Sequence, residues 1–175
     1  MKHTKFSNNS LRQIDQYFDD YISAQKIAGC SLLLWQSEAE RYTMFKGVQD
    51  LESGTPVSRD TIFRIYSMTK PVASVALMML WDRGHFDLND PIARFLPKFN
   101  EMTLYRPDGD HVSAAGQIKM QHVLNHTAGF ILPAFSEHPL RELYVSDGVN
   151  GSRSEGTLTE VIDRLANKPL LFEPG

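Results

Sequence analysis

The chain of 175 residues is long enough for a domain with a substantial core, and its 42% apolar and 22% charged residues are ordinary for a globular protein. The formal net charge is −3, and the lysines and arginines are scattered, so no basic stripe suggests a nucleic-acid partner. The single cysteine, Cys30, excludes an intrachain disulfide and a cysteine-rich metal site.

The start of the chain gives no sign of export. Residues 1–9 are polar and contain no hydrophobic signal core, so we expect a cytoplasmic location. The longest apolar run, residues 75–81, is far too short to cross a bilayer, so we expect no membrane partner.

Residues 10–27 have the pattern of an amphipathic helix, and Ser10 with Gln13 forms a capping-box pattern at its start. Two apolar runs follow, at residues 30–35 and 41–45, and the turn between them predicts a β-hairpin. A two-stranded hairpin is seldom stable alone, so the sheet to which it belongs looks unfinished. The apolar face of the helix consists of Leu11, Ile14, Phe18, Tyr21 and Ile22.

Residues 68–83 form the strongest helical pattern, which Gly84 ends. Pro71 is compatible with this helix because the N–H groups of a first helical turn have no intrahelical partner. Lys70 is the only charged residue before the last turn, and Ser74 is the only polar one between Pro71 and that turn. A helix that is apolar on all sides is normally buried, so we expect this helix in the core, with Lys70 at its buried start.

The second half of the chain predicts short elements. Asp90 followed by Pro91 indicates the cap and first residue of a short helix that ends near Leu96. Three segments follow: a polar loop at residues 100–117, a short helix at 119–126, and a long irregular stretch at 130–155.

A last helix begins at Thr157, which forms a second capping-box pattern with Glu160. We expect two domains: residues 1–66 as the N-terminal part of an α/β domain, and residues 67–175 as a helical domain that carries the helix at 68–83. The predicted apolar face of the last helix consists of Leu158, Val161, Ile162 and Leu165.

Ser67 and Lys70 are the strongest candidates for chemistry. Their spacing of three residues puts both side chains on one helix face, close enough for the lysine nitrogen to reach the serine hydroxyl. Burial and the positive end of the helix dipole both disfavour a charged lysine there, which would make Lys70 a base for Ser67. The Ser67 N–H would supply half of an oxyanion hole. The simpler alternative is that Ser67 only caps the helix and Lys70 extends to the solvent.

Other candidates carry weaker signals. His122 and His126 have a spacing common among zinc ligands, but no third ligand is evident, so we expect no metal and no other cofactor. Phe130, Phe135 and Tyr144 lie in the long irregular stretch, where they would either line an acyl-binding cleft or pin the stretch to the helices.

Four stretches resemble, in the same order, the class C β-lactamase-like branch of the serine β-lactamase and penicillin-binding-protein superfamily, which includes carboxylesterases. Residues 60–71 resemble the segment of this family that carries the nucleophile. Val123-Leu124-Asn125-His126-Thr127-Ala128-Gly129-Phe130 resembles the family's Leu-x-His-Thr-Ser-Gly stretch. The third stretch, residues 87–97 with Asp90-Pro91 and Phe95-Leu96-Pro97, resembles the family's segment after the nucleophile helix. The fourth, residues 172–175, ends in Pro174-Gly175 and resembles the Pro-Gly just before the family's second catalytic motif.

The resemblance implies an α/β (α+β) fold of the β-lactamase/transpeptidase type, an antiparallel sheet flanked by helices plus a helical domain. It also implies that Ser67 is acylated, that Lys70 helps to take its proton, and that His126 is structural, bonding around the turn at Thr127. The family's catalytic tyrosine and its later Lys-Thr-Gly or His-x-Gly strand would follow Gly175. We therefore expect a C-terminal remainder of the protein, or a second chain, to complete the site, and little activity from this chain alone.

The leading function is a carboxylesterase that forms an acyl-enzyme on Ser67 from a small-molecule ester or amide. Alternatives with the same Ser-x-x-Lys chemistry are a β-lactamase, a D-aminopeptidase and an acyltransferase; a non-catalytic binding or assembly relative is an alternative of a different class. Tyr66 adjoins the nucleophile without matching a catalytic position, so it either packs or borders the substrate.

Overall fold

The computed structural model describes residues 6–175, so part of the polar start of the chain lies outside the described residues. The chain forms two compact units, Met1–Arg64 and Ile65–Gly175. Within the described range, no helix has both the length and the apolar character needed to cross a membrane.

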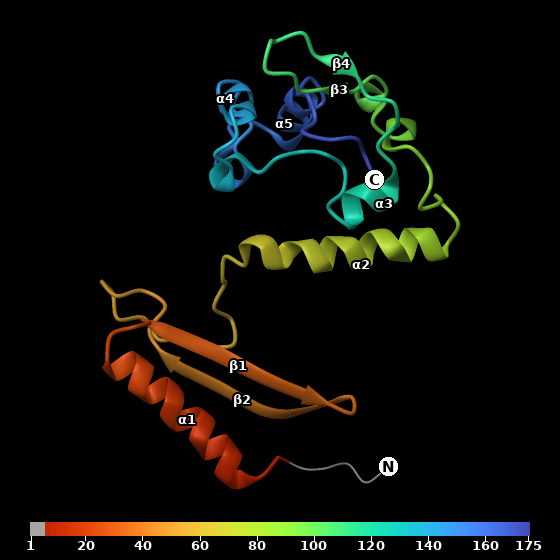
Figure 1. The fold of residues 1–175 in the computed structure, drawn as a ribbon. Coiled ribbons are helices and arrows are strands. Elements are labelled where there is room, and N and C mark those ends of the chain that lie inside the picture. The colour runs from red at the N-terminus through yellow and green to blue at the C-terminus, as the bar shows by residue number, and fades with distance from the viewer. Residues whose placement is uncertain (1–5) are drawn as a thin grey trace. The chain divides into compact units, whose positions relative to one another are not determined.

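The first unit consists of helix α1 (Asn8–Ser23) packed on one face of the hairpin formed by β1 (Gly29–Gln36) and β2 (Ala39–Gly47) (Figure 1). The strands pair antiparallel, with Leu32 opposite Met44. Side chains alternate between the two faces of a strand, so the residues facing α1 are partly or fully buried while their neighbours are exposed. The predicted hairpin is confirmed, and so is the apolar face of α1.

The predicted limits of α1 are wrong at both ends. Ser7, not Ser10, caps the helix, because the Ser7 side chain accepts the backbone N–H of Ser10. The helix ends at Ser23, and Gln25 then takes a left-handed backbone conformation with φ of 54°, which an α-helix does not accommodate.

A polar cluster joins α1 to the hairpin. The Tyr42 hydroxyl donates to Asp15 (2.5 Å), and the Lys46 ammonium donates to Asp19 (2.7 Å) and to the Asp15 backbone carbonyl (2.9 Å). Burial, helped by the Asp15 carboxylate, raises the pKa of Tyr42 to about 12. The cluster therefore fixes where α1 packs against β2.

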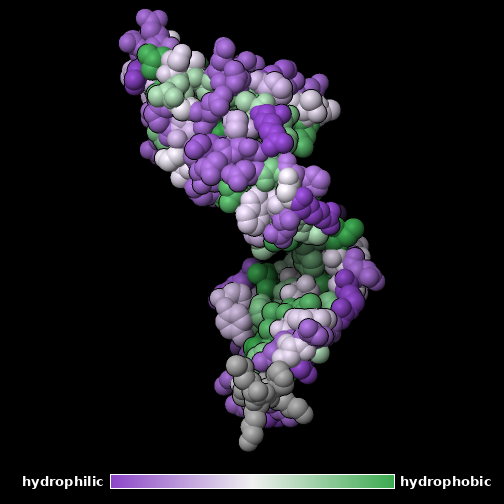
Figure 2. Space-filling model, turned by 90° about the vertical axis from the view of Figure 1, so that its right-hand side faces the viewer, coloured by the Kyte–Doolittle hydropathy of each residue, from purple (hydrophilic) through white to green (hydrophobic). Residues whose placement is uncertain are grey.

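The face of the hairpin opposite α1 is apolar and exposed. Leu33, Phe45 and Trp35 lie on it, and 62% of Trp35 is accessible to solvent. Figure 2 shows apolar surface gathered on this unit. A hairpin with one largely exposed apolar face and, among the described residues, no third strand beside it is what the sequence predicts for an unfinished sheet.

The second unit begins with a 3₁₀ turn, Tyr66–Met68, that leads into α2 (Thr69–Asp82). A main core cluster contains Phe99, Ile118 and Leu170, and a smaller one contains Leu140 and Tyr144. The remaining helices and strands are β3 (Thr103–Leu104), β4 (Val112–Ser113), α3 (Met120–Leu124), α4 (Leu140–Val145) and α5 (Leu158–Leu165), with 3₁₀ turns at Ile92–Arg94, Pro97–Phe99, Pro133–Phe135 and Gly151–Arg153.

Several sequence predictions hold in this unit and others do not. The capping box of α5 is confirmed, with Thr157 N–H donating to the Glu160 carboxylate at 2.7 Å. The helix predicted after Asp90 is only a 3₁₀ turn, because Pro91 is extended and the Asp90 side chain binds the N–H of Asp87 instead. The segments predicted as loops contain the short strands β3 and β4 and the helix α4.

The prediction that α2 is buried on all sides is wrong for this chain. Only Ser74, Leu77 and Met78 are half-buried, and they share one helix face at spacings of three and four residues. The other apolar side chains of α2 are exposed, and 64% of Val72 is accessible. The sequence is that of a core helix, but in this chain only one of its faces is covered.

Gly129 holds the segment after α3 against the end of the chain. Its φ is +90°, and a Cβ placed on it would lie 2.5 Å from the backbone oxygen of Phe172. Its own carbonyl accepts the N–H of Leu171 at 2.8 Å. No side chain fits there without moving the backbone.

We expect Gly129→Ala to lower the free energy of unfolding of the protein by about 2–4 kcal/mol, because both the positive φ and the backbone clash oppose a methyl group. Gly109→Ala is the matched control: Gly109 has a similar φ of +87° with nothing within 4 Å of the added Cβ. Urea unfolding of both variants measures the difference, and equal losses would show that the contact with Phe172 is unimportant.

Candidate active site

The backbone at the start of α2 is strained next to Ser67. Tyr66 has a φ of +45°, a left-handed conformation that is uncommon for a residue other than glycine. Ser67 follows in the 3₁₀ turn, and Lys70 lies in the first turn of α2. Strain of this kind costs about 1–3 kcal/mol and tends to occur at functional sites. Its effect here is to present Ser67 at the very beginning of a helix.

Ser67 and Lys70 are in contact. The Lys70 ammonium nitrogen donates to the Ser67 hydroxyl oxygen at 3.0 Å, and both side chains are exposed. The contact agrees with the predicted spacing, but the predicted burial of Lys70 is wrong. The physical reason is that the covering of this helix face reaches Ser74 and Leu77 but does not extend to the first turn, where Lys70 continues the same face.

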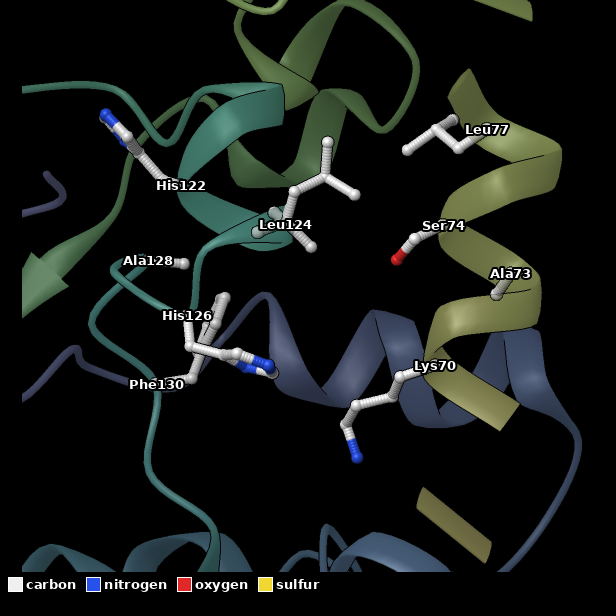
Figure 3. Close-up of a pocket in the computed structure, with 10 residues that line it drawn as sticks. Lys70, Ala73, Ser74, Leu77, His122, Leu124, His126, Ala128 and Phe130 are labelled. Carbon is white, nitrogen blue, oxygen red and sulfur yellow. The ribbon is translucent and has the colours of Figure 1, made fainter. Parts of the chain in front are cut away.

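Lys70 borders a cavity of about 440 Å³ within the second unit (Figure 3). One wall is α2, which contributes Lys70, Ser74 and two apolar residues. The opposite wall consists of α3 and the segment that follows it. The cavity is lined by Lys70, Ala73, Ser74, Leu77, His122, Val123, Leu124, His126, Ala128 and Phe130.

The wall opposite α2 is fixed by backbone contacts. The Asn125 side chain accepts the N–H (3.1 Å) and the hydroxyl (2.7 Å) of Thr127, and the Gly175 N–H donates to the Thr127 carbonyl at 2.9 Å. His122 caps α3, because its Nδ1 accepts the Lys119 N–H at 3.2 Å. The Thr127 N–H also donates to the His122 carbonyl at 2.8 Å, so the turn rests on His122, Asn125 and Gly175, and the expectation that His126 supports it is wrong.

Of the aromatic candidates, Phe130 lines the cavity and the others do not. Tyr144 is fully buried in the smaller core cluster, where its hydroxyl donates to the Pro169 carbonyl at 2.9 Å, so the prediction that it contacts substrate is wrong. Phe135 projects outward with 88% of its surface accessible, and Tyr66 is also exposed. Both lie outside the cavity lining.

Sequence reasoning missed Ala73, Ser74 and Leu77 as cavity residues. The signal was available, because they continue the helical face of Lys70 at spacings of three, four and seven residues. The pair His122 and His126 reaches the cavity, but among residues 6–175 no group of three or more metal-binding side chains comes together.

His122 makes the stability of this wall dependent on pH. Burial, with a smaller effect of the Lys119 charge, lowers its pKa below the ordinary value of 6.5. The unfolded chain therefore binds a proton at a higher pH than the folded one. The contribution of neutral His122 is present above pH 6.5 and is lost as the pH falls through its lower, folded-state pKa.

We expect the free energy of unfolding to fall between pH 7.5 and pH 5, and His122→Asn to reduce that fall, because asparagine still offers an acceptor but does not titrate. Urea titrations at the two pH values check this. His85→Asn, at an exposed histidine, is the control. An undiminished fall in the His122 variant contradicts the assignment.

Comparison of this structure with solved structures defines the class of the fold. EstCE1, described as a hydrolase with promiscuous acyltransferase activity, matches with a TM-score of 0.76 and 30% sequence identity over 94% of this chain and 41% of that one. Simvastatin synthase LovD from Aspergillus terreus has a TM-score of 0.71 at 21% identity over 96% of this chain and 44% of its own, a likeness of fold alone. The predicted β-lactamase/transpeptidase-like fold is confirmed.

The family follows from the sequence match. Residues 14–175 match the family model described as Beta-lactamase, so the chain belongs to the β-lactamase family, as its Ser-x-x-Lys segment predicts. Esterase EstB from Burkholderia gladioli is 30% identical over 165 residues, which are 93% of this chain and 40% of that protein. The chain thus spans about 40% of the length of these relatives.

Proposed function

We propose that this chain carries the nucleophile of a serine hydrolase that cleaves carboxylic esters through an acyl-enzyme on Ser67. The observation that carries the proposal is the 3.0 Å contact between the Lys70 nitrogen and the Ser67 oxygen at the edge of a cavity. Nucleophile and base lie one helical turn apart at the N-terminus of α2, where exposed N–H groups favour a developing negative charge.

The proposed reaction has two steps. The Lys70 amine takes the hydroxyl proton of Ser67 while the serine oxygen attacks the ester carbonyl, and the tetrahedral intermediate collapses to an acyl-serine. The protonated lysine returns its proton to the departing alcohol. Water then attacks the acyl-serine in the same way and releases the carboxylic acid and free Ser67.

An ester is favoured over other acyl compounds by the relatives and by the cavity. EstB is named an esterase, and EstCE1 is a hydrolase with promiscuous acyltransferase activity. The wall formed by Ala73, Leu77 and Phe130 suits an apolar acyl group. Acyl transfer to an alcohol uses the same residues and is the second candidate, because the acyl-serine is common to both reactions.

We infer that the complete site contains more than this chain. The hairpin and α2 each expose an apolar face of the kind that proteins normally cover, and the relatives are more than twice as long. Further strands and a further catalytic side chain would come from a C-terminal remainder or a second chain. In this proposal the Met1–Arg64 unit is the first part of the α/β domain and the second unit is the helical domain.

The test is covalent labelling of the full-length protein with a fluorophosphonate, followed by peptide mapping. We expect a single phosphonylated residue, Ser67. A fluorescent penicillin and an ester substrate distinguish β-lactam from ester reactivity. The absence of any adduct between pH 6 and 9 would favour the non-catalytic binding relative instead.

A further inference from the structure

The cavity contains a second side chain suited to proton chemistry. His126 lines it from the wall opposite α2, and Figure 3 shows its imidazole and the Lys70 amine both extending into the cavity from those opposing walls. His126 has a φ of +64°, a left-handed backbone that histidine, asparagine and aspartate tolerate better than other side chains. The ring therefore reaches the cavity from a strained backbone position.

The ring has no structural task in the turn that carries it. The polar groups of Thr127 are satisfied by Asn125 and by the Gly175 N–H. Throughout residues 6–175, no hydrogen bond to the His126 ring is found, and the residue is exposed to the cavity rather than packed. A strained residue whose side chain supports nothing around it is more readily explained by function than by stability.

Lys70 needs a hydrogen-bond acceptor on the side away from Ser67. A neutral lysine amine has one lone pair and two N–H donors, and it can take the Ser67 proton only when the lone pair faces the hydroxyl. An acceptor across the cavity that binds one N–H would hold the amine in that orientation. A neutral imidazole is such an acceptor, and one water molecule can bridge it to an amine that it does not contact directly.

The other polar residues of the cavity are less suitable. Nδ1 of His122 already accepts the Lys119 N–H, which leaves its other nitrogen as a donor in the neutral ring. Ser74 lies on the same helix as Lys70, one turn further on, so it does not approach the amine from across the cavity.

We propose that His126 is a positioning residue for Lys70: across the cavity, through a bridging water molecule, its neutral imidazole accepts a hydrogen bond that orients the Lys70 amine and keeps the lone pair directed at Ser67. The proposal rests on the proposed hydrolase function and adds the residue that controls its base. The titratable groups that share the cavity with His126 are Lys70 and His122. A doubly protonated imidazole has only donors and could not accept this hydrogen bond.

The test measures Ser67 acylation in the full-length protein, from the burst of p-nitrophenol released by p-nitrophenyl acetate between pH 5 and 9. His126→Gly keeps the left-handed backbone and removes the ring, and His126→Asn keeps both the backbone preference and an acceptor that does not ionise. His85→Asn is the control at an exposed histidine.

We expect His126→Gly to slow acylation about 10- to 100-fold with KM changed less than about twofold, the range of a general-base contribution that is partly lost. His126→Asn should recover most of that rate above pH 7 and should lose less activity than the wild type towards pH 5. A structural role predicts neither the rescue nor the altered pH profile.

The outcomes separate the two proposals. If the wild type is acylated on Ser67 and His126→Gly is acylated equally fast, the positioning role is wrong and the hydrolase function stands. If the wild type is not acylated at all, both the hydrolase function and the positioning role are wrong. If His126→Gly does not fold, the pH profile of His126→Asn decides, and a profile identical to that of the wild type overturns the inference.

Discussion

Ser67→Ala should abolish covalent labelling and reduce ester hydrolysis by the full-length protein about 10⁴-fold or more, because the variant lacks the oxygen that forms the acyl-enzyme. The fold should be unaffected, since Ser67 is exposed and its contact with Lys70 is on the surface of the unit. Steady-state hydrolysis of p-nitrophenyl acetate and fluorophosphonate labelling check the result.

Ser146→Ala is the matched control for this variant, because Ser146 is an exposed serine at the end of α4, away from the cavity lining. It should keep full labelling. A Ser67→Ala protein that still carries the fluorophosphonate would assign the nucleophile to another residue and remove the basis of the proposed function.

Lys70→Ala should lower the rate of Ser67 acylation about 10²- to 10⁴-fold, the usual contribution of a general base, while leaving the folded structure intact. Lysine and serine form an exposed pair here, so their contact adds little to stability. The loss should therefore appear in the rate constant of acylation and not in the urea midpoint. Both are measured on the same preparation.

Lys98→Ala serves as the control for loss of a positive charge. Lys98 pairs with Asp163 on the surface, at 2.8 Å, and takes no part in the cavity. Unchanged acylation in Lys70→Ala would leave Ser67 without its proposed base and would direct attention to another proton acceptor.

The features predicted correctly from sequence are those set by local spacing. The Ser67–Lys70 contact depends on one helical turn, and the face of α1 depends on a repeat of three and four residues, so both can be read from the chain. The capping box at Thr157 is likewise a pattern within four residues.

The incorrect predictions concern long-range contacts. Tyr144 lies in a stretch rich in loop residues, and its burial comes from packing with Leu140 and from a bond to Pro169, 25 residues further along the chain. The strands β3 and β4 have two residues each, too few to show a period of two.

The exposure of α2 could not be predicted from the sequence for a different reason. An apolar helix predicts that something covers it, without saying which part of the protein does so. Val72 and Val75 are exposed here because the covered face of the helix is the one with Ser74 and Leu77. The role expected for His126 failed similarly, since Asn125 and Gly175 occupy the Thr127 turn in its place.

The two walls of the cavity come from separate parts of the chain. The reacting pair lies within four consecutive residues, whereas the facing wall is formed more than 50 residues later, by residues 122–130. Substitutions at the apolar lining positions Val123, Leu124 and Phe130 would reshape the space available to the proposed acyl group while leaving Ser67, Lys70 and His126 in place. Such independence would let one reaction diversify among substrates, and it identifies these three positions as the ones to randomise when an altered acyl preference is sought.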